Sequence, residues 1–131
     1  MTGIDTNVLI RWLLADPDAP EQSEAVSRHL ADLRDDVFVG MVVLAETAWV
    51  LRKTFGFPRD RLAAVLKSIL EAPGVLIESS AAVSEAIQTF ASGGAGFPDC
   101  LIGARNAAVG CRTTLTFDRD ASKGARFTLI D

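Results

Sequence analysis

Short apolar segments alternate with segments of helical character along the whole chain, and this alternation restricts the fold more than any other sequence feature. The apolar segments predict strands at Met1–Asp5, Val37–Val39, Val75–Ile77, Thr113–Phe117 and Phe127–Ile130. Helical spacing or long apolar runs predict helices at Thr6–Leu14, Pro20–Leu33, Met41–Phe55, around Leu62–Leu70, around Val83–Phe90 and at Pro98–Val109. The pattern predicts an α/β fold: a three-layer sandwich whose central, mostly parallel sheet of about five short strands is flanked by helices.

The chain is expected to be one domain over residues 1–131, because no repeat, low-complexity tract or linker interrupts it. Charges and prolines interrupt every apolar stretch before the ~20 residues that a membrane span needs. Met1–Asp5 lacks the basic and apolar regions of a secretory signal, which favours a cytoplasmic protein. In that reducing compartment, Cys100 and Cys111 are expected to remain free thiols.

The net charge of −4 bears directly on nucleic-acid binding. Proteins that bind nucleic acid through its phosphates usually present a basic face. Either this chain does not bind nucleic acid, or its acidic residues gather in a pocket where metal ions neutralise them. The placement of the acids decides between these two interpretations.

Three aspartates stand where a parallel sheet places a ligand site, beyond the carboxyl ends of its strands. Asp5 ends the first predicted strand, Asp118 follows the fourth, and Asp99 opens a helix after the glycine-rich run 92–96. Each has an ordinary alternative role: Asp5 and Asp99 suit helix caps, and Asp118 suits a turn. Together they could converge on one edge of the sheet.

Glu46 is the sharpest single signal, because the helix predicted at Met41–Phe55 is otherwise apolar almost all round and is expected to be buried. Burying an unpaired carboxylate is costly, so Glu46 is expected to be exposed, paired, protonated or bound to a cation. The alternative is a surface glutamate that pairs with Arg52 or Lys53.

Four acids in such positions fit the chemistry of hard divalent cations, which prefer oxygen ligands. Two ions ~4 Å apart can clamp the attacking and leaving oxygens of a phosphoryl displacement. The metal ions would also explain how an acidic pocket attracts an anionic backbone. Four acids that meet in one pocket would therefore suit this kind of metal chemistry.

Four motifs occur in order along the chain: Ile4-Asp5-Thr6-Asn7-Val8-Leu9-Ile10, Leu44-Ala45-Glu46, Phe97-Pro98-Asp99-Cys100-Leu101-Ile102 and Leu115-Thr116-Phe117-Asp118-Arg119-Asp120. Together they resemble the PIN-domain ribonucleases, in particular the VapC-type toxins of bacterial and archaeal type II toxin–antitoxin pairs. The resemblance covers essentially the whole chain. Each motif is short, and their common order makes the set specific.

The resemblance implies that Asp5, Glu46, Asp99 and Asp118 are the catalytic acids and hold Mg²⁺ or Mn²⁺. The implied reaction is endonucleolytic hydrolysis of RNA, with a metal-activated water as nucleophile, and it would inhibit translation. The implied partners are the RNA substrate, a VapB-type antitoxin whose tail blocks the site, and a second copy of the chain in a homodimer.

The resemblance also implies supporting residues around the acids. Asn7 or Thr6, together with Thr116, would hold the carboxylates by hydrogen bonds. Asp118 or Asp120 could be the last ligand; Asp118 is favoured because it directly follows Thr116-Phe117, which leaves Asp120 as an auxiliary ligand or a solvated turn residue.

Four cationic residues are candidates for contacting RNA at the rim of the site, although a solvated surface role suits each equally well. They are Arg11, Arg52, Lys53 and Arg105.

Two other functions compete with the nuclease. A non-catalytic binding module with the same fold would be favoured by an incomplete set of acids. A phosphatase with Asp5 as nucleophile generally needs a second acid two residues later, where this chain has Asn7.

Overall fold

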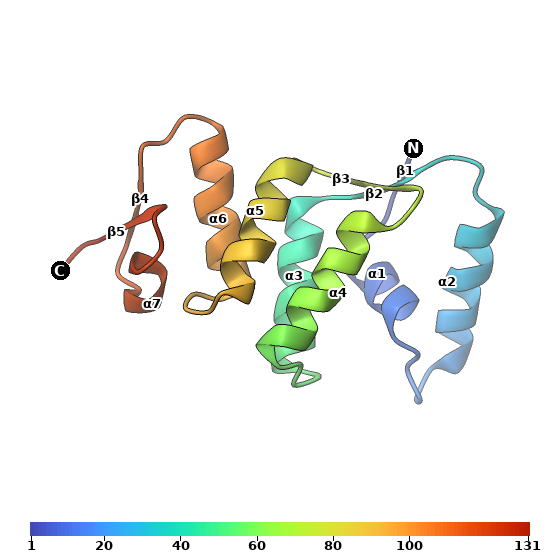
Figure 1. The fold of residues 1–131 in the computed structure, drawn as a ribbon. Coiled ribbons are helices and arrows are strands. Elements are labelled where there is room, and N and C mark those ends of the chain that lie inside the picture. The colour runs from blue at the N-terminus through green and yellow to red at the C-terminus, as the bar shows by residue number, and fades with distance from the viewer.

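A computed structural model describes residues 1–131 and contains seven helices and five strands (Figure 1). The helices are α1 (Thr6–Leu13), α2 (Pro20–Asp32), α3 (Met41–Lys53), α4 (Arg59–Glu71), α5 (Ser80–Ala91), α6 (Phe97–Ala108) and α7 (Arg119–Ser122). The strands are β1 (Thr2–Gly3), β2 (Val37–Val39), β3 (Val75–Ile77), β4 (Thr114–Thr116) and β5 (Phe127–Leu129). None of the helices is long and apolar enough to cross a membrane.

The strands are all parallel and form two sheets. One sheet has the order β1-β2-β3, and the other pairs β4 with β5. The predicted α/β class with about five short parallel strands and flanking helices is therefore confirmed. The single central sheet that we expected is divided here, because no backbone ladder joins β1 to β4.

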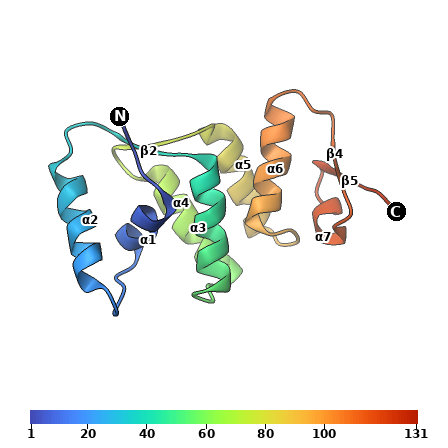
Figure 2. The ribbon, with the colours of Figure 1, turned by 180° about the vertical axis from the view of Figure 1, so that it is seen from behind.

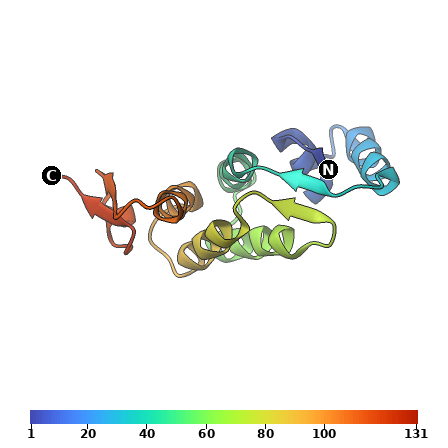
Figure 3. The same cartoon turned by 90° about the horizontal axis from the view of Figure 1, so that it is seen from above.

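The molecule is elongated, with α2 at one end and the unit formed by β4, α7 and β5 at the other (Figures 1 and 3). We call residues 114–129 the C-terminal unit. It lies beyond α6, and the two chain termini are far apart. Figure 3 shows that α6 separates the C-terminal unit from the sheet of β1, β2 and β3.

The core forms where α3, α4, α5 and α6 pack against each other and against the first sheet. Leu62, Leu66 and Ile69 recur at helical spacing on α4, and all three are buried. The rings of Phe90 on α5 and Phe97 on α6 meet edge to face, with their centroids 6.1 Å apart. This packing fixes the start of α6 against α5.

A close contact between α6 and β5 attaches the C-terminal unit to the core. Gly103 is buried on α6, and a Cβ atom there would lie 2.6 Å from Cε2 of Phe127. Arg126 also donates to both carboxylate oxygens of Glu85 on α5. A helical glycine thus provides the space for the Phe127 ring.

Two sequence predictions need correction. The helix α3 is not buried all round: Val42 is 73% exposed and Trp49 is 56% exposed, because only one side of α3 faces the core. The helix α7 was not predicted, because four residues are too few to show helical periodicity. Cys100 is buried and Cys111 is exposed, and both are free thiols as expected.

Candidate active site

The four predicted acids belong to four helices that follow one another along the molecule. Asp5 caps α1, Glu46 lies within α3, Asp99 lies in the first turn of α6, and Asp118 caps α7. The helix α3 packs against α1 on one side and against α6 on the other. Figure 2 shows α1, α3 and α6 in this order, with α7 beyond them.

Asp5 acts as the N-cap of α1. Its Oδ1 accepts a hydrogen bond of 3.0 Å from the backbone N–H of Val8, and the side chain is exposed. The capping role anticipated from the sequence is therefore confirmed. It is compatible with ligand binding, because the cap fixes the orientation of the carboxylate and engages only one of its oxygens.

Glu46 is exposed and accepts a hydrogen bond from a residue of α1. The hydroxyl of Thr6 donates to Oε1 of Glu46 over 2.9 Å. The alternative in which Glu46 pairs with Arg52 or Lys53 is not found, because Glu46 belongs to none of the chain's ion pairs. Thr6, of the two candidates Thr6 and Asn7, thus makes the contact with an acid.

Asp99 is half-buried in the first turn of α6. It is not the cap, because the N-cap residue is Gly96. Burial raises the pKa of Asp99 above its ordinary value, and the negative charge of Asp118 raises it further. Asp99 and Asp118 are therefore close enough to repel each other when both are ionised.

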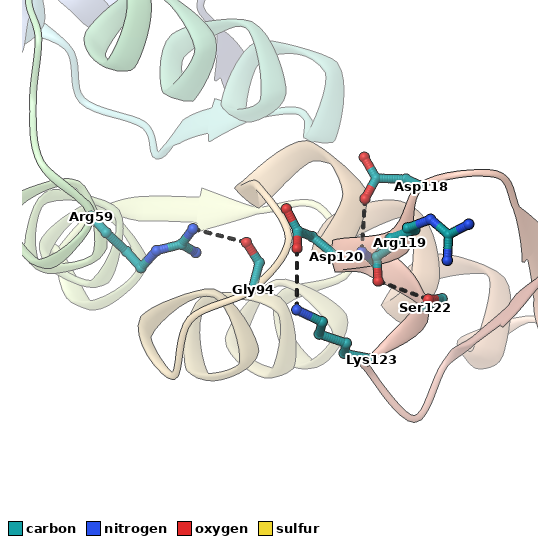
Figure 4. A network of polar contacts seen from close by, with 8 residues as sticks. Arg59, Gly94, Asp118, Arg119, Asp120, Ser122 and Lys123 are labelled. Carbon is teal, nitrogen blue, oxygen red and sulfur yellow. Dashed lines mark hydrogen bonds and ion pairs between the residues drawn. The ribbon is translucent and has the colours of Figure 1, made fainter.

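Asp118 is exposed and held from two directions. Its Oδ1 accepts a hydrogen bond of 2.9 Å from the backbone N–H of Ala121, which makes it the N-cap of α7. Its own backbone N–H donates to Oγ1 of Thr116 over 2.9 Å. Thr116 therefore contacts the backbone of Asp118 and not its carboxylate. Figure 4 shows the carboxylate at the start of α7.

The acids lie in two groups in this structure. Asp5 and Glu46 are linked through Thr6, which follows Asp5 and bonds to Glu46, whereas Asp99 interacts with Asp118. No three Asp, Glu, His or Cys side chains lie close enough together to ligate one ion. The mutual repulsion of Asp99 and Asp118 suits a divalent cation, since a cation between them would remove the cost of ionising both.

Asp120 points away from this arrangement and toward Lys123. Its Oδ1 lies 3.5 Å from Nζ of Lys123, and both side chains are exposed (Figure 4). Asp120 also lines a cavity of about 440 Å³ that Gly94 and Arg126 share. The two aspartates of this motif thus have different surroundings, and only Asp118 acts on Asp99.

Arg59 is a site-supporting residue that the sequence did not reveal. Its guanidinium donates to the carbonyl oxygens of Phe90, Ala95 and Gly94 over 3.0, 2.8 and 2.9 Å. It also lies over the Phe90 ring, 4.6 Å from the centroid. These bonds hold the loop 92–96 that leads into α6 and Asp99 (Figure 4). The partners lie more than 30 residues away, so no local motif signals them.

The cations expected at the rim differ in how they are engaged. Arg11 contacts Gln22 and Asp16, and Arg52 donates to the carbonyl of Phe57. These contacts explain their positions without RNA.

Lys53 and Arg105, by contrast, are exposed and take part in none of the chain's ion pairs or side-chain hydrogen bonds. They are therefore the two rim candidates whose charges are available to a ligand.

Comparison with known proteins agrees with the resemblance seen in the motifs. The PIN domain model matches residues 4–126, a range that contains all four acids. A VapC ribonuclease of Aquifex aeolicus (strain VF5) is 24% identical over 123 residues, which cover 94% of this chain and 91% of that protein. The PIN domain match contains both groups of acids and reaches into the C-terminal unit as far as Arg126. This chain belongs to the PIN-domain family.

Proposed function

We propose that this chain is a Mg²⁺- or Mn²⁺-dependent endoribonuclease whose site is built from Asp5, Glu46, Asp99 and Asp118. The main support is that Asp99 is half-buried and that its pKa is raised by burial and by the charge of Asp118. The chain also belongs to the PIN-domain family. Two acids that repel each other bind a divalent cation more favourably than two separate ones. The relative named a VapC ribonuclease supports RNA as the substrate.

Asp99 and Asp118 would hold a cation on the α6 side, and Asp5 and Glu46, which form a separate group in this structure, would act from α1 and α3. The chemistry that such a cation supplies is Lewis acidity toward a phosphodiester. The chain's own contribution is orientation: backbone N–H groups fix the carboxylates of Asp5 and Asp118, and the Thr6 hydroxyl fixes Glu46.

Lys53 and Arg105 would attract the RNA backbone, since their charges have no partner within the chain. Thr116 would keep Asp118 at the start of α7 through its backbone contact, and Asp120 would remain an auxiliary acid paired with Lys123.

We further propose the biological context that the relative's name suggests: the toxin of a VapBC-type pair that inhibits translation, neutralised by a VapB-type antitoxin. In this proposal residues 1–131 act as one nuclease domain in the cytoplasm and pair as a homodimer.

The test is cleavage of an end-labelled RNA by the purified chain, freed of any antitoxin, with Mg²⁺, with Mn²⁺ and with EDTA. Cleavage should require the metal and should fall more than about 100-fold in Asp99→Asn and Asp118→Asn, because even residues that only contact metal ligands cost 10–100-fold. Asp32→Asn is the matched control, since Asp32 is exposed on α2 at the far end of the molecule.

Cleavage that survives EDTA, or that persists in both aspartate variants, would contradict the proposal. Binding of RNA without cleavage in any metal would instead indicate a non-catalytic PIN-domain module.

A further inference from the structure

An exposed stripe on α3 continues from Glu46 toward the end of the helix. Its members are spaced by three or four residues and so lie on one face: Val42, Glu46, Trp49 and Lys53. Trp49 is a large aromatic side chain that stays 56% exposed. Leu44 and Leu51 on the opposite side of α3 are buried. Trp49 is therefore exposed because it lies on the solvent-facing side of a well-packed helix.

Trp49 lines a cavity of about 300 Å³ between α3, α4, the end of α5 and the start of α6. Arg52, Lys53 and Pro98 line the same cavity. Glu46 lies one helical turn before Trp49, and Asp99 directly follows Pro98. Neither acid lines the cavity, but each lies within three residues of a lining residue on the same helix. The volume of the cavity is at the lower end of ligand pockets.

The charge around Trp49 is opposite to that of the whole chain. Residues 52–61 contain four of the 13 Lys and Arg residues and a single acid, although the net charge is −4. Arg59 holds the loop 92–96, and the Arg61 guanidinium lies 3.9 Å from the centroid of the Phe57 ring. Lys53 is left with its charge free beside the indole.

We propose that Trp49 is a stacking platform for one nucleobase of single-stranded RNA, beside the phosphodiester that the acids would hold, with Lys53 contacting the adjoining phosphate. The inference rests on the proposed function and adds a base subsite to it. An exposed aromatic ring next to a free cation is the arrangement that binds single strands through base faces and phosphates.

The test measures binding without cleavage, in EDTA, and uses Trp12→Phe as the background so that Trp49 is the sole tryptophan. Trp12 lines a separate cavity with Leu13 and Ile69. The probes are an eight-nucleotide oligouridine and an abasic oligomer of the same length. Binding of oligouridine should quench the Trp49 fluorescence, and binding of the abasic oligomer should not.

With binding followed by the anisotropy of end-labelled oligomers, Trp49→Ala in this background should weaken oligouridine binding roughly 5- to 150-fold, as expected for loss of one base–aromatic stack, and should leave abasic binding unchanged. Trp49→Phe should retain most of the affinity. Lys53→Ala should weaken both oligomers alike, because it removes a phosphate contact.

Three results would overturn the base subsite: unchanged oligouridine affinity in Trp49→Ala, an equal loss for both oligomers, or protection of Trp49 from acrylamide that grows with protein concentration in the absence of RNA. The last result would assign the face to a second copy. Normal metal-dependent cleavage by Trp49→Ala, with unchanged binding, would remove the subsite and leave the proposed nuclease intact. Absence of oligouridine binding in the background protein would also remove the subsite, and absence of metal-dependent cleavage as well would overturn both proposals.

Discussion

The hydroxyl of Thr6 donates a hydrogen bond of 2.9 Å to Oε1 of Glu46, across 40 positions of sequence. The bond joins the first residue of α1, directly after Asp5, to the middle of α3. Glu46 is exposed on its helix, so without this bond its side chain would be free to adopt several rotamers. Thr6 is thus the connection through which the α1 and α3 acids are held relative to each other.

Thr6→Val should lower metal-dependent cleavage and the apparent affinity for Mn²⁺ by roughly 10- to 100-fold, because mutation of a residue that orients a metal ligand typically lowers activity or metal affinity by that factor. Thr6→Ser keeps the hydroxyl and should stay near the original chain. The measurements are single-turnover cleavage and Mn²⁺ titration. If Thr6→Val matches Thr6→Ser in both, the hydrogen bond has no role in the site.

Asp99 gives a prediction for stability as a function of pH in the metal-free protein. Its pKa is raised in the folded chain by burial and by Asp118, so just above pH ~4 the folded state retains a proton that the unfolded state has released. The free energy of unfolding should therefore fall as pH rises through this range. The asparagine in Asp99→Asn does not titrate, so this variant should not show the part of the pH-dependent fall in stability that comes from Asp99.

The measurement is urea unfolding in EDTA between pH 3.5 and 7. The stability of Asp99→Asn relative to the original chain should increase as pH rises and then level off above the raised pKa. Groups that do not interact with Asp99 contribute equally to both proteins and cancel in the difference. A difference that does not change with pH would show that Asp99 titrates normally.

Arg59→Lys should destabilise the chain by about 1–3 kcal/mol, because a lysine keeps the charge but cannot reach three carbonyl oxygens at once. Hydrogen exchange should accelerate at Gly93, whose amide donates to the carbonyl of Phe90 that Arg59 also holds.

Arg61→Ala is the matched control on the same helix; it loses only a contact with the Phe57 ring and should cost about 0.5–1 kcal/mol. Exchange of the loop amides that is equally slow in Arg59→Lys would show that the loop is held without Arg59.

Gly103→Ala should be less costly when the Phe127 ring is absent. With Phe127 present, the new methyl group meets the ring and should cost about 1–3 kcal/mol of overpacking, which exceeds the gain in helix propensity. In Phe127→Ala only Cβ of Arg126, 3.0 Å away, still crowds the methyl group, so the cost of the same substitution should fall by about 1 kcal/mol or more. Urea unfolding of the four proteins measures both costs, and an equal cost in both backgrounds would refute the packing explanation.

The elements themselves could be predicted from the sequence because their signals are local. Val37–Val39 and Val75–Ile77 are strands with the bounds that the apolar segments indicated, and the helix ends differ from the predictions by only a few residues. The helix α7 was the exception, because its four residues are too few for periodicity. The motifs around Asp5, Glu46, Asp99 and Asp118 identified the PIN-domain family for the same reason: each is a short contiguous pattern.

The sequence by itself therefore determined the order of strands and helices, the family, and which acids are candidates for the site. The tertiary structure alone decided which side of α3 is exposed, that Thr6 bonds to Glu46, that Asp118 acts on Asp99, and that Arg59 holds the loop before α6. The physical reason is distance along the chain. Periodicity and capping involve residues within one or two helical turns, whereas burial, ion interactions and clamping contacts depend on segments that only folding brings together.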